Sequence, residues 1–156
     1  MANSTRKRII DNLVTTLAAI TTGGGYNLSV GEAKRGWKHF NNVSEDLLTS
    51  GKFCIYAAGA DEKRRNHSQR EFRSDLLISV VIYVMTANST DTEGLEQILD
   101  NAIEDATKAI MVDVTRGGYS VTTEIGDVDT DKGAFTPYAS AEMIVRCEYR
   151  ASVSAP

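Results

Sequence analysis

The chain has 156 residues, of which 42% are hydrophobic, and a formal net charge of −4 at pH 7. A chain of this size and composition can bury an adequate core without metals or disulfides, so we expect residues 1–156 to form one domain, with a frayed tail over 152–156. No apolar run approaches the ~18 residues of a membrane span, and no signal peptide follows Arg6–Arg8, so we expect a protein made in the cytosol without a membrane partner. Cys54 and Cys147 both lie in strand patterns and are expected to be buried free thiols.

An amphipathic helix is expected to open the chain. Asn3 and Ser4 offer an N-cap, and six aliphatic residues then recur at helical spacing: Ile9, Ile10, Leu13, Val14, Leu17 and Ile20. The glycines of 23–25 end this helix; because they follow a helix and do not open one, they favour a cap over a phosphate cradle. A short extended piece over 26–37 and a polar loop over 39–51, with one helical turn near 44–48, are expected next.

The longest predicted element is a β-strand over 71–87, which contains many branched and aromatic residues and neither Gly nor Pro. One face carries six apolar residues and is interrupted only by Ser74: Phe72, Leu76, Ile78, Val80, Ile82 and Val84. At ~3.3 Å per residue the strand is roughly 50 Å long. Since a domain of this size cannot cover such a strand throughout, we expect its Arg-rich start to project from the body, where another subunit can pair with it.

Charged residues crowd the segment before this strand. We predict a buried strand over 52–58 and a charged loop over 61–70, whose cations contact another subunit together with the first arginine of the long strand: Lys63, Arg64, Arg65, Arg70 and Arg73. Acidic residues lie among these cations, and no known nucleic-acid-binding module surrounds them. A subunit contact or a solvated loop is therefore favoured over sequence-specific DNA recognition.

A second helix is expected after a turn at 88–91, with a seven-residue apolar face: Leu95, Ile98, Leu99, Ala102, Ile103, Ala106 and Ile110. Its acids Glu96, Asp100 and Glu104 follow one another at intervals of four residues, with Glu93 and Asp105 beside them and only Lys108 to offset them. Such repulsion destabilises an isolated helix by ~0.2–0.5 kcal/mol per pair. An ordinary solvated face explains the pattern, and the alternative is a surface that meets a basic partner or repels passing DNA.

Two final strands are predicted over 119–128 and 139–151. Asp127, Asp129 and Asp131 imitate the start of a calcium loop, but Gly133 comes one residue late and Tyr138 stands where a bidentate Glu is needed, so we expect a solvated acidic loop. The order α-β-β-β-α-β-β predicts an α+β fold with a mainly antiparallel sheet, both helices packed on one face, and one very long strand.

Charge is divided unevenly along the chain. Residues 1–73 carry 12 Lys/Arg and 7 Asp/Glu (12 − 7 = +5), whereas residues 74–156 carry 5 and 14 (5 − 14 = −9). The division can arise by chance. Alternatively, one side of the molecule attracts the other side of a copy, and head-to-tail contacts of that kind close into rings or run on as filaments.

Motifs for catalysis or metal binding are missing from the sequence. His39 and His67 are the only histidines, neither has metal-ligand spacing, and no HExxH, CxxC or GxSxG motif occurs. We expect no catalytic residues, no metal and no cofactor. A small α+β enzyme is the alternative of a different class, and it would need a pocket that holds His39 or His67 beside a carboxylate with a perturbed pKa.

The arrangement of these elements resembles the tail terminator (tail completion) proteins of long-tailed bacteriophages, over nearly the whole chain and without an invariant signature. The resemblance rests on the opening helix, the glycine turn, the short strand, the long strand, the acidic helix and the closing strand, through Arg6, Ile9, Leu13, Tyr26, Cys54, Ile55, Tyr56, Val81, Tyr83, Val84 and Tyr149. Neck and minor tail proteins share a similar size and element order, so another neck or tail-tube joining protein is the runner-up.

The resemblance implies a structural virion protein of the tail or neck, present in the host cytoplasm during assembly. It implies a hexameric ring that caps the tail tube, stops its polymerisation and presents a docking face to the head connector, while genome DNA passes through the lumen without specific binding. A lumen wall that does not hold DNA is expected to be acidic or neutral. The favoured candidates are the acids of the second helix, Glu93, Glu96, Asp100 and Glu104, ahead of the three aspartates at 127–131.

Overall fold

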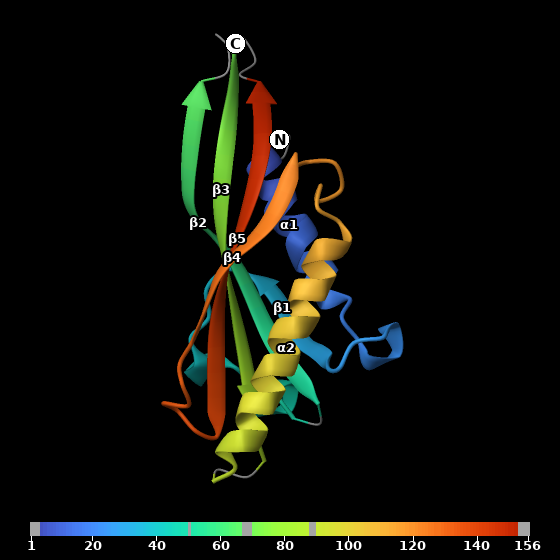
Figure 1. Ribbon diagram of the computed structural model, residues 1–156, viewed down its shortest axis with the longest axis vertical. Helices are drawn as coiled ribbons and strands as arrows, with labels where there is room; N and C mark the ends of the chain where they lie inside the picture. The colour runs from blue at the N-terminus through green and yellow to red at the C-terminus, as the bar shows by residue number, and fades with distance from the viewer. Residues whose placement is uncertain (1–3, 50, 67–69, 88–89, 153–156) are drawn as a thin grey trace.

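The computed structural model describes residues 4–49, 51–66, 70–87 and 90–152, which form two α-helices, three 3-10 turns and one five-stranded sheet. Figure 1 shows an elongated molecule in which the long strands run along the long axis. The elements are α1 Thr5–Ala18, η1 Thr22–Gly24, β1 Ser29–Arg35, η2 Phe40–Asn42, η3 Glu45–Leu47, β2 Lys52–Asn66, β3 Glu71–Met85, α2 Thr92–Val112, β4 Thr122–Thr130 and β5 Tyr138–Ser152.

The sheet has the order β1-β2-β3-β5-β4, and every pair is antiparallel except β1 with β2, which is parallel. The predicted α+β class with a mainly antiparallel sheet is therefore confirmed. Because β1 and β2 are parallel, no hairpin joins them. A parallel pair needs a crossover connection, and residues 36–51, which contain η2 and η3, provide it.

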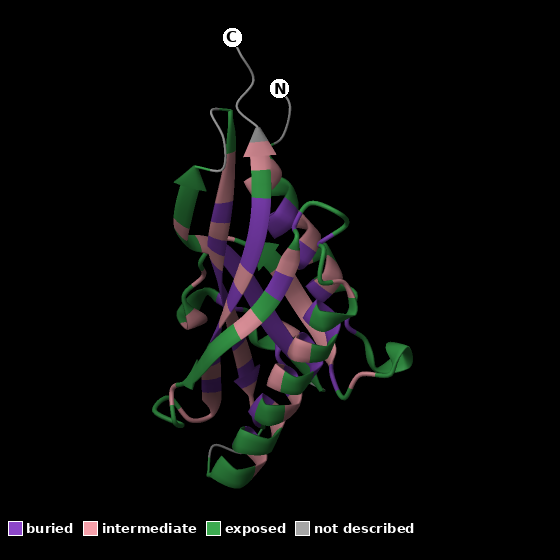
Figure 2. Cartoon of the chain, turned by 45° about the horizontal axis from the view of Figure 1, so that its top comes forward, coloured by how far each residue is buried: buried purple, intermediate pink, exposed green. Residues whose placement is uncertain are grey.

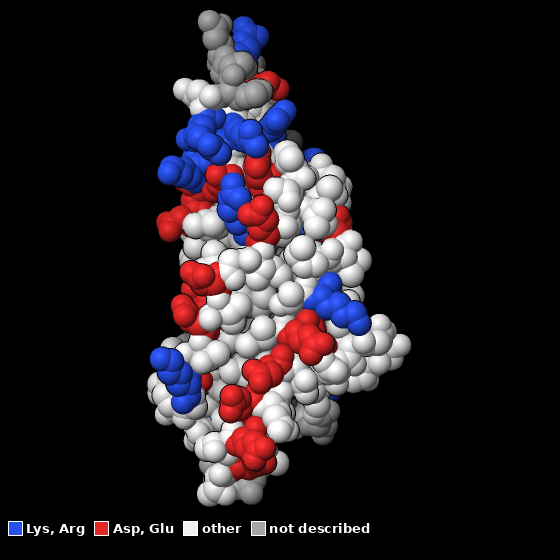
Figure 3. All heavy atoms as spheres, viewed as in Figure 1, with Lys and Arg blue, Asp and Glu red and all other residues white. Residues whose placement is uncertain are grey.

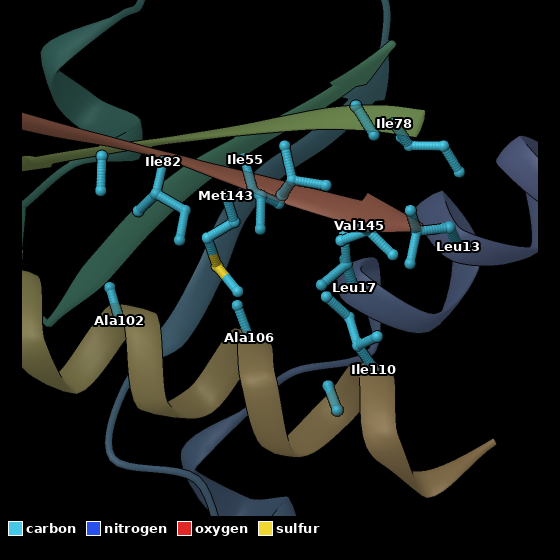
Figure 4. Close-up of a cluster of buried hydrophobic side chains, with 14 of the residues drawn as sticks. Leu13, Leu17, Ile55, Ile78, Ile82, Ala102, Ala106, Ile110, Met143 and Val145 are labelled. Carbon is cyan, nitrogen blue, oxygen red and sulfur yellow. The ribbon is translucent and has the colours of Figure 1, made fainter. Parts of the chain in front are cut away.

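Both helices pack on one face of the sheet, as predicted. The residues of β3 that face them are those that the period-2 pattern selects, from Leu76 to Val84, and Ser74 is buried beside them. Figure 4 shows Leu17 of α1 and Ala106 and Ile110 of α2 lying under the strands, against Met143 and Val145 of β5. The acceptor for the Lys7 amide is the Ser4 hydroxyl, at 3.2 Å, so Ser4 is the N-cap of α1.

The crossover covers part of the opposite face of the sheet. Val43 and Leu48 pack there against Cys54 and Tyr56 of β2, in a cluster separate from the main core. Two tyrosines fix this layer, because Tyr56 Oη donates to Glu32 Oε1 at 2.8 Å and Tyr83 Oη donates to the Lys38 carbonyl oxygen at 2.6 Å. Cys54 and Cys147 are buried free thiols, as predicted.

The predicted boundary between a short strand and a charged loop is wrong. β2 extends to Asn66, so Asp61–Asn66 belongs to a strand as long as β3. A register shift between Gly59 and Glu62 lets β2 continue, and its charged side chains then alternate between the two faces and find partners across the strands. Charged residues, which are poor strand formers in isolation, are stabilised here by these cross-strand pairs.

The three long strands therefore share one end, which we call the arm: residues 60–66 of β2, 71–77 of β3 with Arg70 directly before them, and 146–152 of β5. Its tip projects past both helices in Figure 1, and its exposed ends contrast with the buried middle of the sheet in Figure 2. The start of β3 does project, as expected, but β2 and β5 flank it on both sides. It is thus not open to strand pairing by another subunit. The expected frayed tail, apart from Ser152, lies outside the described residues.

Candidate functional site

The arm carries a row of three arginines across its three strands. Arg73 of β3 lies directly opposite Arg65 of β2 and opposite Arg150 of β5. Residues that lie opposite one another in antiparallel strands share a face, so the three guanidinium groups are neighbours on the face away from the helices, and like charges in this position repel. The next row inward contains Asp75 and Glu148, which partly neutralise the arginine row.

The structure brings the predicted interface cations together on the arm, but on two faces. Arg65 and Arg73 are paired with Asp75, at 3.3 Å, and with Glu148, respectively. Arg64 points to the helix side, where its Nε donates to Glu62 Oε2 at 2.8 Å and its guanidinium lies 4.6 Å from the centre of the Phe72 ring. Three of the five cations are therefore already engaged within the chain, whereas Lys63 and Arg70 form no ion pair among the described residues.

A buried carboxylate anchors the base of the arm. Glu62 has a side chain only 8% exposed, lies 3.8 Å from Arg6 of α1, and accepts a hydrogen bond from the Tyr149 hydroxyl. Burial raises the pKa of Glu62, but hydrogen bonds from Tyr149 and Arg64 outweigh it and leave the pKa below its ordinary value. Burial, followed by the bond to Glu62, raises the pKa of Tyr149. Glu62 thus stays ionised and ties α1 to two strands.

The acids of α2 form the second charged surface. Glu93, Glu96, Asp100 and Glu104 are all exposed, and Figure 3 shows an acidic stripe along α2 below the basic cluster on the arm. Asp105 does not belong to this stripe. It is 1% exposed and accepts hydrogen bonds from the backbone N–H groups of Asn27, at 3.0 Å, and Leu28, at 2.8 Å. The grouping of Asp105 with the acidic face is therefore wrong, because it holds the loop after α1.

A groove of about 510 Å³ lies between the N-terminal half of α2 and the end of the β4–β5 hairpin. Its floor is apolar, with Leu95, Leu99 and Ala139. Glu93, Glu96 and Asp100 line it, together with Lys132 from the hairpin, whereas Glu104 lies outside it. The groove was not predictable from the sequence, since Lys132 and Ala139 are far from α2 along the chain. The acidic spacing on α2 was the only signal.

The second set of acids lies on the β4–β5 hairpin. Asp127 and Asp129 belong to β4 and are exposed, so only Asp131 is in the loop. Its carboxylate accepts from the Gly133 N–H at 3.1 Å, which closes a local turn. The residues that the structure describes include no group of three His, Cys, Asp or Glu able to hold a metal ion.

The one histidine that the structure describes has a structural role. Nδ1 of His39 accepts from the Asn41 N–H at 3.2 Å and caps η2, and its ring lies 4.7 Å from that of Phe40. His67 lies outside the described residues. Among the described residues, no histidine lines the groove beside α2 or the shallower hollows on the arm and beside the crossover.

Neither helix in the described part of the chain is long and apolar enough to cross a membrane. The chain matches no protein family model, and a comparison with curated proteins gives no match either.

Proposed function

We propose that the protein is a ring-forming structural subunit of a phage tail, a tail terminator that caps the tail tube, stops its polymerisation and forms the docking face for the head connector. One observation carries the proposal. The subunit is elongated, and its basic arm and its acidic groove lie at opposite ends (Figures 1 and 3). Such a polarity suits contacts between one end of a subunit and the other end of its neighbour.

The fold adds support through the resemblance. The observed order of helices and strands is the one on which the likeness to tail terminators rests, including the opening helix, the long strand and the closing strand. The arm takes up a large part of the three longest strands, and only its helix-side face joins the main core, through Leu76, Cys147 and Tyr149. A subunit whose longest strands form a projecting surface is better suited to assembly than to enclosing a small substrate.

The ring we propose surrounds the path of the genome, so its wall must not hold DNA. Neutralising phosphates with Lys or Arg adds salt-dependent affinity, and exposed acids avoid it. Two surfaces meet this need: the stripe on α2 and the exposed Asp127 and Asp129 on β4. The spacing of acids in the sequence favours α2 as the lumen wall. The groove gives α2 a competing role as a docking surface, and if α2 has that role, β4 supplies the lumen wall.

The proposal is tested by adding the purified protein to assembling tail-tube subunits and measuring tube lengths by electron microscopy. A terminator shortens the tubes in proportion to its concentration and is found only at their ends. Incorporation along the tube would make it a tube subunit and would contradict the proposal, and so would tubes of unchanged length. Native mass spectrometry of the protein alone or bound to tube ends should give a ring mass, most simply that of six copies.

A further inference from the structure

The groove beside α2 has the features of a docking site. Its floor is formed by Leu95, Leu99 and Ala139, and three carboxylates line it. In the part of the chain that the structure describes, none of Glu93, Glu96 and Asp100 has an ion-pair partner, although Glu96 and Asp100 repel each other along the helix. The single cation in its lining is Lys132.

The arm has the opposite charge imbalance, an excess of cations. The row of Arg65, Arg73 and Arg150 faces only two carboxylates in the next row, Asp75 and Glu148, and Asp75 also pairs with Arg146 at 3.0 Å. Arg150 and Arg70 are exposed, and neither forms an ion pair among the described residues. Within the described part of the chain, the tip of the arm therefore carries two cations, Arg70 and Arg150, that no ion pair offsets.

We propose that the groove receives the arm tip of a second copy of this chain. An arginine suits the groove because its aliphatic stem can lie on an apolar floor while its guanidinium reaches carboxylates at the edge. The arm and the start of α2, which lines the groove, lie toward opposite ends of the long axis (Figure 1), so one molecule cannot make this contact with itself. The contact is heterologous, and successive copies close into a ring if the rotation between them allows it.

This inference rests on the proposed assembly function and assigns the contact within it. It also moves Glu93, Glu96 and Asp100 from the lumen wall to a subunit interface. The two assignments predict different outcomes for the same substitutions. Lys in place of lumen acids should leave the ring intact and slow DNA passage, whereas Lys in place of groove acids should prevent the ring from forming.

The test is a charge exchange between the two ends, read by native mass spectrometry and sedimentation. Glu96→Lys with Asp100→Lys should weaken self-association at least about tenfold, and Arg70→Glu with Arg150→Glu should do the same, because each places like charges in the contact. The variant that carries all four changes should recover assembly, since its charges are again opposite. Glu104→Lys, on the same helix but outside the groove, should assemble as the wild type does.

Circular dichroism and thermal unfolding should show that every variant is folded. The inference would be overturned if the variant with all four changes did not recover assembly, or if the Glu96→Lys, Asp100→Lys variant assembled fully. Either result would leave the proposed function intact as long as the wild-type protein forms a ring. If the wild-type protein stays monomeric, alone and on tail-tube ends, the proposed function fails as well. Loss of tube-end binding with unchanged self-association would assign the groove to another basic protein and would also overturn the inference.

Discussion

The arm and the body of this molecule use the same three strands but are held together differently. In the body, Ile78, Ile82 and Val145 are fully buried beneath α1 and α2, and each such side chain contributes ~1.5–3 kcal/mol through burial. In the arm, the face away from the helices is held by ion pairs such as Arg65–Asp75, and exposed pairs contribute only ~0.2–1 kcal/mol each. The outer face of the arm is therefore weakly held and has contacts that it can exchange for those of a partner, whereas its helix-side face shares the main core with the body through Leu76, Cys147 and Tyr149.

The largest expected effect is in the body. Ile78→Ala should lower the free energy of unfolding by ~2–5 kcal/mol, because it opens a cavity in the main core between the helices and the sheet. Leu77→Ala, one residue away on the half-buried opposite face, should cost clearly less. Denaturant titration measures both variants. Equal losses would show that the two faces are packed alike and would contradict the comparison.

A second prediction concerns two adjacent acids of α2. Asp105→Ala leaves the buried N–H groups of Asn27 and Leu28 without their acceptor, and each orphaned group costs ~1–3 kcal/mol. The matched variant Glu104→Ala changes an exposed side chain and should stay within about 0.5 kcal/mol of the wild type. Thermal and denaturant unfolding distinguish the two. Equal losses of unfolding free energy in the two variants would show that Asp105 is no more important to the fold than the exposed acids of the stripe.

The third prediction concerns pH and the base of the arm. The folded pKa of Glu62 lies below its ordinary value of 4.5, so its contribution is fully present above that value and is lost as pH falls through the folded pKa. Glu62→Gln should flatten this part of the curve of stability against pH. Tyr149→Phe should flatten it partly, because it removes a hydrogen bond that favours the ionised form. Curves parallel to the wild type for both variants would rule out this network.

A small effect on stability is expected at the arm tip. Arg65→Ala removes an exposed pair with Asp75 and should lower the free energy of unfolding by at most about 1 kcal/mol. Its effect on self-association should be larger than its effect on stability and should fade in 1 M salt, where the Debye length is ~3 Å. An unfolding loss as large as that of Ile78→Ala would contradict the division between arm and body.

What the sequence predicted follows from periodicity. The alternation in β3 marked the face that the helices cover, and the helical spacing in α1 and α2 marked the residues that cover it. The extent of β2 was not predictable in the same way. Strand propensity weighs Asp61–Asn66 residue by residue, whereas their stability comes from partners on β3 and β5 that are distant in sequence.

The candidate site was predicted only in part, for a related reason. The cations at 63–73 were found because they are adjacent in sequence, but Arg150, which completes the arginine row, lies on a strand that closes the chain. The groove is likewise built from segments that are distant in sequence, since α2 supplies its acids and the β4–β5 hairpin supplies its other wall. Asp105 was misplaced because its backbone partners at 27 and 28 follow α1 and lie far from it in sequence.

The most direct test of the head-to-tail contact is a crosslink between two different single variants. Arg150→Cys and Asp100→Cys each place a thiol at one proposed end, while Cys54 and Cys147 are buried and should react slowly. With a bismaleimide, the mixture of the two variants should give crosslinked dimers, whereas each variant alone should stay uncrosslinked. A double variant should give a ladder of multimers that ends at the size of the ring. If the mixture gives no more dimer than either variant alone, the arm of one copy does not lie in the groove of the next.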